Sequence, residues 1–197
     1  IRDSVVAVCR SGSTELEADG AEVVSGIDVA DSAAVNQLAD RLEGRRIDIL
    51  INNAGILSDE SLDELDFDRM RRQFEVNSLG PLRVTAALRN NLGRGSKVAI
   101  VTSRMGSIED NTSGGRYGYR MSKAAVNMAG RSLARDLEKN GVAVAILHPG
   151  FVRTDMTDRQ GLVDAPESAA GLMARIDQLS MESSGSFWHA NGEELPW

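Results

Sequence analysis

Tyr119 and Lys123 are the two side chains whose types and spacing point most directly to chemistry. They lie four residues apart in a segment expected to be helical, so they share one face of the helix about 6 Å apart along its axis. A free tyrosine titrates near about pH 10, and a neighbouring ammonium group favours the phenolate. The pair could therefore transfer a proton. The same spacing also arises by chance.

Two further polar residues could serve such a pair. Ser103 ends an apolar run and begins a loop, where its hydroxyl could hydrogen-bond a substrate carbonyl or act as an ordinary turn or capping residue. Asn77 lies inside a predicted helix, where asparagine has a low propensity and a packed amide needs a partner. It is either a satisfied core amide or the holder of a water molecule.

Short apolar runs rich in β-branched residues predict the strands that position these groups. Runs with little alternation are typical of parallel strands buried on both faces, and four of them occur, at 5–9, 47–51, 97–102 and 142–147. A weaker strand is expected at 23–28 and an edge strand at 186–189. Amphipathic stretches between them predict helices over 30–42, 66–91, 119–140 and 166–178. This alternation indicates an α/β protein.

Boundary residues support these helices. Asp31 is expected to cap the first helix, Pro166 to lie in the opening turn of the last, and Gly141 to adopt a left-handed conformation after the third, with Gly93 a weaker candidate after the second. The loops 104–116 and 154–165 follow strands at the end where doubly wound sheets bind ligands. Within them, the candidate pocket walls are 107–116 and 156–163, whose mixture of Met, Leu, Val and Asn suggests a moderately apolar carbonyl substrate.

Length and composition exclude several classes of protein. A chain of 197 residues with 42% hydrophobic content fits one domain, residues 1–197. The net charge of −7 argues against nucleic-acid binding, which needs a basic surface. One cysteine and two histidines cannot form a disulfide framework or a clustered zinc site, and we expect a reducing, cytoplasmic location. No apolar run approaches the roughly 18 residues that span a bilayer, so no membrane association is expected.

Five motifs follow one another in a definite order. They are Asn52-Asn-Ala-Gly55, Asn77, Ser103-Arg-Met-Gly106, Tyr119-x-x-x-Lys123 and Pro149-Gly-Phe-Val-Arg-Thr154. In this order the chain resembles the classical short-chain dehydrogenase/reductase family, from about Val5 to its end. The stretch from Thr102 to Lys123 and the closing Trp197 are similar to the C-factor and carbonyl-reductase-like branch of that family.

The resemblance implies a Rossmann-like, doubly wound parallel sheet and an enzyme that moves hydride between NAD(P) and a small carbonyl or alcohol. It implies that Tyr119 is the general acid/base, that Lys123 lowers the pKa of Tyr119 and holds the nicotinamide ribose, and that Ser103 polarises the substrate carbonyl. Asn77 would position a water that links Lys123 to solvent. The family also implies a homodimer or homotetramer formed through the helices at 66–91 and 119–140.

The resemblance also assigns a cofactor site. Asn52, Ala54 and Gly55 would line the adenosine side, where small residues allow the backbone to approach a ligand closely. Asp28 and Val29 match positions that contact adenine. Tyr119 and Lys123 would contact the nicotinamide ribose. The residues that would surround the nicotinamide are Pro149, Gly150, Val152 and Thr154, although Pro-Gly also commonly marks an ordinary turn.

Cofactor preference depends on the end of the strand at 5–9. An acidic residue there binds the ribose 2′-hydroxyl of NAD, whereas an arginine accommodates the 2′-phosphate of NADP. This strand ends Cys9-Arg10 and has no carboxylate at that point. Arg10 therefore favours NADP over NAD, although a solvated arginine is also common at a strand end.

One part of the family pattern is absent. The family begins with a strand and a Gly-x-x-x-Gly-x-Gly turn whose amides and following helix bind the pyrophosphate, and this sequence contains no such motif. In the family strand order 3-2-1-4-5-6-7, the missing strand would leave a gap of roughly 10 Å between strands 2 and 4. We expect the natural polypeptide to be longer than this sequence. The alternative is a genuine truncation without a cofactor site.

Two other functions are compatible with the motifs. The first is a non-catalytic signalling or interaction protein on a degenerate oxidoreductase scaffold, which gains weight if the truncation is genuine. The second is an extended epimerase or dehydratase, which shares Tyr-x-x-x-Lys but needs a larger substrate domain than the short segment after Thr154 provides.

Overall fold

The computed structural model describes residues 4–197, whose six strands form two parallel sheets. The first sheet pairs β1 (Val6–Val8) with β2 (Glu22–Val24). The second sheet has the order β3-β4-β5-β6 and comprises β3 (Ile49–Asn52), β4 (Lys97–Val101), β5 (Ala143–His148) and β6 (Phe187–His189). The six predicted strands are thus confirmed in position, with ends that differ by a few residues.

Helices separate the strands in the expected α/β alternation. They are α1 (Thr14–Ala18), α2 (Ser32–Arg41), α3 (Phe67–Phe74), α4 (Gly80–Ala87), α5 (Tyr117–Asp136) and α6 (Ala165–Gln178). A π-helical turn, Glu75–Leu79, joins α3 to α4, and the expected continuous helix over 66–91 is therefore three segments that end in a short 3₁₀ turn, Arg89–Asn91. The short helix α1 was not predicted.

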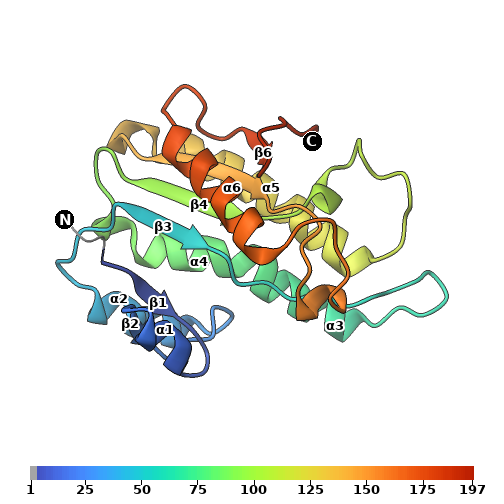
Figure 1. The fold of residues 1–197 in the computed structure, drawn as a ribbon, viewed down its shortest axis with the longest axis horizontal. Coiled ribbons are helices and arrows are strands. Elements are labelled where there is room, and N and C mark those ends of the chain that lie inside the picture. The colour runs from blue at the N-terminus through green and yellow to red at the C-terminus, as the bar shows by residue number, and fades with distance from the viewer. Residues whose placement is uncertain (1–3) are drawn as a thin grey trace.

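Two helices cover opposite faces of the second sheet, as Figure 1 shows for α5 and α6. α5 packs Val126 and Leu133 against Val98 and Val144, which point to one face of β4 and β5. On the other face the strands carry mostly alanine, so that Ile176 of α6 lies close to the backbone of the sheet. β4 and β5 are consequently buried on both sides, as their continuous apolar sequence predicts.

The sheet is interrupted between β1 and β3, where the absence of the family's first strand predicts a gap. No pairing joins β1 to β3 in the part of the chain that the structure describes. The two strands that flank the interruption expose Val8, Ile49 and Ile51. The prediction that these strands are buried on both faces was therefore wrong for β1 and β3, because no strand or helix of residues 4–197 covers this part of them.

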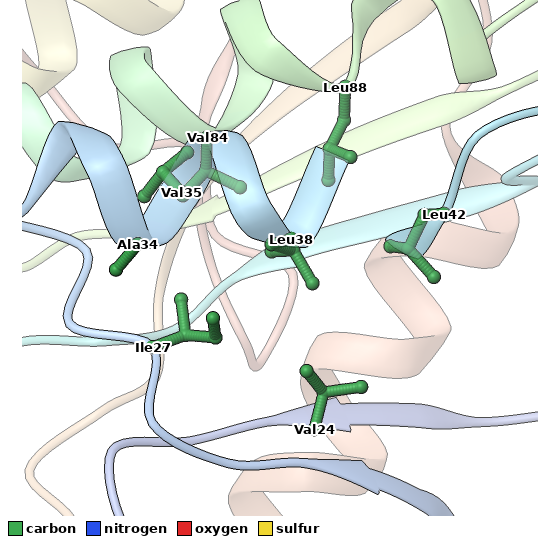
Figure 2. Packing of buried hydrophobic residues seen from close by; sticks show 8 residues of the cluster. All are labelled: Val24, Ile27, Ala34, Val35, Leu38, Leu42, Val84 and Leu88. Carbon is green, nitrogen blue, oxygen red and sulfur yellow. The ribbon is translucent and has the colours of Figure 1, made fainter. Parts of the chain in front are cut away.

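Helix packing holds the first sheet to the second across this interruption. Figure 2 shows side chains of β2, of the loop after it, of α2 and of α4 that meet in one apolar cluster: Val24, Ile27, Ala34, Val35, Leu38, Leu42, Val84 and Leu88. Leu50 of β3 packs against the same cluster. Side-chain packing through α2 and α4 thus replaces strand pairing as the link between the sheets.

The predicted helix ends are mostly confirmed. Asp31 accepts a hydrogen bond from the Ala33 N–H, Pro166 lies in the first turn of α6, and Gly141 has a φ of 69°. Gly93 has no positive φ, and the left-handed residue near the end of that segment is Gly95. Between residues 4 and 197, none of the helices is both long enough and apolar enough to cross a bilayer.

The contrast between buried apolar residues of this cluster and exposed apolar residues of β3 gives a test of this packing. We expect Leu38→Ala to lower the free energy of unfolding by about 2–5 kcal/mol, because Leu38 is 1% exposed within the apolar cluster that links the two sheets, which we call the linking cluster. Ile51→Ala, at a side chain that is 45% exposed, should cost less than about 1 kcal/mol. Urea denaturation of both variants measures the difference. Equal losses would show that Ile51 is covered in solution.

Candidate active site

The register of the central strands brings the candidate residues to one edge of the second sheet. Asn52 pairs with Ile100, and Val101 pairs with Leu147, so three parallel strands end at the same level. Ser103 lies just beyond β4, and His148 ends β5. This carboxyl edge is where ligands bind in doubly wound folds.

Tyr119 lies in the first turn of α5 and faces Ser103. Burial raises the pKa of Tyr119, while a hydrogen bond with the Ser103 side chain and the charge of Arg116 act in the opposite direction. The Ser103 hydroxyl also accepts a hydrogen bond from the Met105 N–H at 3.2 Å, which fixes its position at the start of the loop. A phenol and a hydroxyl therefore converge on one point above the sheet.

Lys123 lies one turn further along α5 and is 4% exposed. Its Nζ donates to the Val101 carbonyl at 3.1 Å and lies 5.6 Å from the centroid of the Tyr119 ring. Burial lowers the pKa of Lys123 to about 8. The resemblance implies that Lys123 lowers the pKa of Tyr119. The pKa of Tyr119 is raised in this structure, because burial of the phenol outweighs the hydrogen bond with Ser103 and the charge of Arg116.

The amide of Asn77, in the π-helical turn, is hydrogen-bonded through both its oxygen and its nitrogen. Its Oδ1 accepts from the Ile56 N–H at 2.8 Å, and its Nδ2 donates to the Ile56 carbonyl and to Ser122 Oγ on α5. A Cβ on Gly55 would lie 3.5 Å from Asn77 Oδ1 and 3.6 Å from Lys123 Nζ. The structure thus brings Asn77, Lys123 and Gly55 together, and the π turn is the local irregularity that accompanies this placement.

The residues expected on the adenosine side lie at the ends of β2 and β3. Asp28 accepts from the Ala30 N–H and pairs with Arg72 at 2.6 Å, and these contacts together with the charge of Arg10 lower the pKa of Asp28. Val29 packs against Gly80 at the start of α4. Ala54 is exposed.

Asn52 points away from this corner. Its side chain is buried, and its Nδ2 donates to Thr85 on α4 at 3.1 Å. Only the backbone of Asn52 is therefore available at the sheet edge.

The segment expected around the nicotinamide follows β5 and is tied to α6. The Pro149 carbonyl accepts from Ser168 at 2.7 Å, Gly150 has a φ of 92°, and Val152 bridges to Val163. The Thr154 N–H donates to Thr157 Oγ1, which stabilises the next short turn. Glycine is required at position 150, because other residues rarely adopt this backbone conformation.

The sequence prediction missed a pair of histidines beside this segment. The His148 and His189 rings meet edge to face with centroids 4.7 Å apart. Burial lowers the pKa of His148 to about 3, and the charges of His189, Arg104 and Lys123 act in the same direction. The position of His148 between a buried strand and Pro149 was the available signal, since a polar residue that ends a central strand points to the ligand edge.

A cavity of about 340 Å³ opens beside the first turn of α5. Its walls are the loop after β3, at Asp59, Ser61 and Glu64, and the loop after Ser103, at 113–116. The second wall overlaps one of the two loops expected to contact substrate. The other loop, 154–165, does not line this cavity.

Comparisons with known proteins agree with the fold. The family model described as short chain dehydrogenase matches residues 5–163. A 1-hydroxy-2-glutathionyl-2-methyl-3-butene dehydrogenase from Rhodococcus sp. (strain AD45) is 45% identical over 99% of this chain and 89% of its own length. The C-signal of Myxococcus xanthus is 49% identical over 77% of this chain and 93% of its own length.

Among solved structures, the NADPH-bound carbonyl reductase from chicken fatty liver superposes with a TM-score of 0.87 at 28% identity. The superposition covers 98% of this chain and 88% of that protein. The parallel sheet, the helices on its two faces and the site at its carboxyl edge define a Rossmann-like α/β oxidoreductase. The chain belongs to the short-chain dehydrogenase family, as its motifs predicted.

Removing the buried amine of Lys123 should stabilise the fold. Below about pH 8 the folded chain carries a buried ammonium group, which lowers its stability. Between about pH 8 and the ordinary lysine pKa of 10.5, the unfolded chain binds more protons than the folded chain, so stability rises with pH and this cost disappears. We therefore expect Lys123→Met to raise the free energy of unfolding at pH 7 by about 1–3 kcal/mol. The gain should shrink as the pH rises through this window.

Urea denaturation at several pH values measures this effect, and Lys139→Met, at an exposed lysine, serves as the matched control. A Lys123→Met chain less stable than the wild type at pH 7 would contradict the prediction.

Proposed function

We propose that the chain is an NADPH-dependent oxidoreductase that interconverts a small carbonyl compound and its alcohol. The observation that carries the proposal is the convergence of the Tyr119 phenol and the Ser103 hydroxyl above the carboxyl edge of the sheet, with the Lys123 amine one helical turn away. Membership in the short-chain dehydrogenase family supports the reaction class.

The side chains divide the work of carbonyl reduction. The nicotinamide, when bound, supplies hydride to the carbonyl carbon. Ser103 donates a hydrogen bond to the carbonyl oxygen, and Tyr119 transfers its phenolic proton to that oxygen as negative charge develops. The positive charge of Lys123 stabilises the resulting phenolate. Asn77 Oδ1 accepts one hydrogen bond, so its second lone pair would accept from a water that returns a proton through Lys123.

The residues present fit the nicotinamide half of the cofactor. Among residues 4–197, Lys123 Nζ donates one hydrogen bond, to the Val101 carbonyl, which leaves donors for ribose hydroxyls. Gly55 leaves the space between Asn77 and Lys123 free of a side chain, and Gly150 turns the chain before Val152 and Thr154. These 197 residues include no glycine-rich turn for the pyrophosphate, so the proposal assigns no residue to that group.

NADP is preferred over NAD because two positive charges meet at the adenosine corner. Arg10 at the end of β1 and Arg72 on α3 both act on Asp28 and lower its pKa. A 2′-phosphate placed near Arg10 would gain a charge-assisted hydrogen bond. The solved structure of the carbonyl reductase from chicken fatty liver has NADPH bound, which supports the same preference.

We infer that the substrate is a carbonyl compound or its alcohol, because Tyr119 and Ser103 converge where one carbonyl oxygen would accept a hydrogen bond from each. The Rhodococcus relative is named for the dehydrogenation of a glutathione-conjugated alcohol. A panel should therefore contain simple ketones and aldehydes together with alcohols that carry a glutathionyl group.

A homodimer or homotetramer is proposed from the exposed apolar side chains of the helical layer. Met121 and Met128 on α5 and Leu79 and Leu82 beside and within α4 are each at least 40% exposed. Burial of such side chains between copies would stabilise an oligomer.

The second candidate function is signalling without catalysis. One observation favours it. The chain is 49% identical to a protein called C-signal, and the match covers 93% of that protein's length. On that hypothesis the chain would neither bind NADPH nor depend on Tyr119 for its biological effect.

Removal of the Tyr119 hydroxyl tests the mechanism. Tyr119→Phe should lower kcat by about 10²- to 10⁴-fold, because the proton donor is lost while the ring still packs. The carbonyl panel is assayed with NADPH and NADH on the polypeptide at the length that the source cell makes. Tyr117→Phe, at the neighbouring tyrosine, is the control and should leave turnover unchanged. Unchanged turnover in Tyr119→Phe would refute the mechanism, and absence of both turnover and NADPH binding would favour signalling.

The charge of Arg10 should determine the choice of cofactor. Arg10→Ala should lower the ratio of kcat/KM for NADPH to that for NADH about 10-fold, since a charge-assisted hydrogen bond to the 2′-phosphate is lost. Arg41→Ala, at an exposed arginine that ends α2, should leave the ratio as it is. A ratio unmoved by Arg10→Ala would place the 2′-phosphate elsewhere.

A further inference from the structure

A buried carboxylate lies beneath the first turn of the helix that carries Tyr119. Glu60, in the loop after β3, is 3% exposed. Its Oε1 accepts from Ser58 Oγ at 2.5 Å and from Gln73 Nε2 at 2.9 Å, and its Oε2 accepts from the Gly118 N–H at 3.2 Å. Three donors from three segments therefore converge on one carboxylate.

The backbone of the same loop fixes the start of α5. The Arg116 N–H donates to the Glu60 carbonyl at 2.7 Å, and the Arg116 side chain pairs with Asp59. Arg116 has a φ of 49°, a left-handed conformation that is costly for a residue with a side chain and persists only where its surroundings impose it. The contacts with residues 59 and 60 are those surroundings.

Close packing prevents the first turn of α5 from moving toward α3. A Cβ added at Gly118 would overlap the Gln73 amide and the Met70 side chain, so α5 and α3 touch backbone to side chain at this point. Gln73 is itself 1% exposed, and its Oε1 accepts from the Ser58 N–H at 3.2 Å. The loop, α3 and α5 are thus locked through the Ser58, Glu60 and Gln73 side chains.

We infer that Glu60 is a positioning residue for Tyr119. It holds the N–H of the residue that precedes Tyr119, and thereby fixes the direction of the phenol toward Ser103. The inference rests on the proposed function, and it explains the use of a carboxylate at this place. All of its partners are donors, and the first turn of a helix carries partial positive charge. A glutamine would direct its own N–H groups at one of these donors.

The chain allows a test that needs no substrate, because it contains only two tyrosines. In a Tyr117→Phe background, the ultraviolet absorbance of the phenolate follows Tyr119 alone. The groups that face this phenol are Ser103, Arg116 and Lys123. Adding Glu60→Gln should lower the pKa of Tyr119 toward the ordinary value of 10.0, because a loosened first turn lets water reach the phenol.

The kinetic consequence should be a lower kcat at a nearly unchanged cofactor KM, by about 10- to 100-fold, as expected for a misplaced catalytic group. Asp63→Asn, at an exposed carboxylate of the same loop that does not line the cavity, is the matched control and should change neither the titration nor kcat. Ser58→Ala removes only one donor and should give smaller shifts in the same direction, which supplies the test if Glu60→Gln does not fold.

A folded Glu60→Gln chain in which Tyr119 titrates and turns over as in the control would overturn the inference. The titration does not depend on turnover. If Tyr119→Phe leaves turnover intact, the proposed mechanism fails, while the titration still decides whether Glu60 positions Tyr119.

Discussion

The common register of β3, β4 and β5 is the constraint on which the rest of the site depends. Because Asn52 pairs with Ile100 and Val101 with Leu147, Gly55, Ser103 and Pro149 leave the sheet at the same edge. α5 then packs across β4 and β5 and brings Tyr119 over Ser103. A one-residue slip of any strand would turn its buried side chains to the opposite face. The apolar core therefore fixes the positions of the polar residues.

The polar centre reduces the stability of the fold that the core provides. Tyr119, Lys123 and His148 are all removed from water, and burial disfavours the charged form of each. Lys123 has one hydrogen-bond partner, the Val101 carbonyl, and His148 Nδ1 has none among the described residues. Groups held in this way are ready to bind a ligand or transfer a proton, which is the usual reason that active sites are less stable than packed cores. Asn77 is different, because its amide is bonded on both sides.

The sequence predicted the central strands well because β4 and β5 are apolar on both faces, a pattern produced by burial alone. It also singled out Asn77, Ser103, Tyr119 and Lys123 as candidates from their order in the chain, and the structure brings Ser103, Tyr119 and Lys123 close together. The π turn at Asn77 could not be predicted, because it depends on contacts with Ile56 and Ser122, distant in sequence. Glu60 was missed for the same reason, since a glutamate among Ser, Asp and Glu in a loop looks like a solvated charge. The exposure of Ile49 and Ile51 could not be predicted either. It depends on whether another strand lies beside β3, and the residue types of β3 carry no information about that.

The interruption of the sheet divides the proposed cofactor site between two units. Arg10 and Asp28, at the adenosine corner, belong to the β1–β2 unit, whereas Lys123 and Gly150 belong to the β3–β6 unit. Within the described part of the chain, these units are joined by the α2 and α4 packing around Leu38 and Val84, and no strand pairing links them. A dinucleotide would contact both, so its binding energy would hold the units together, and any change in the α2–α4 contact would alter the distance between its two ends. Affinity for the cofactor and stability of the linking cluster are therefore coupled, because a ligand that binds only the assembled form stabilises that form.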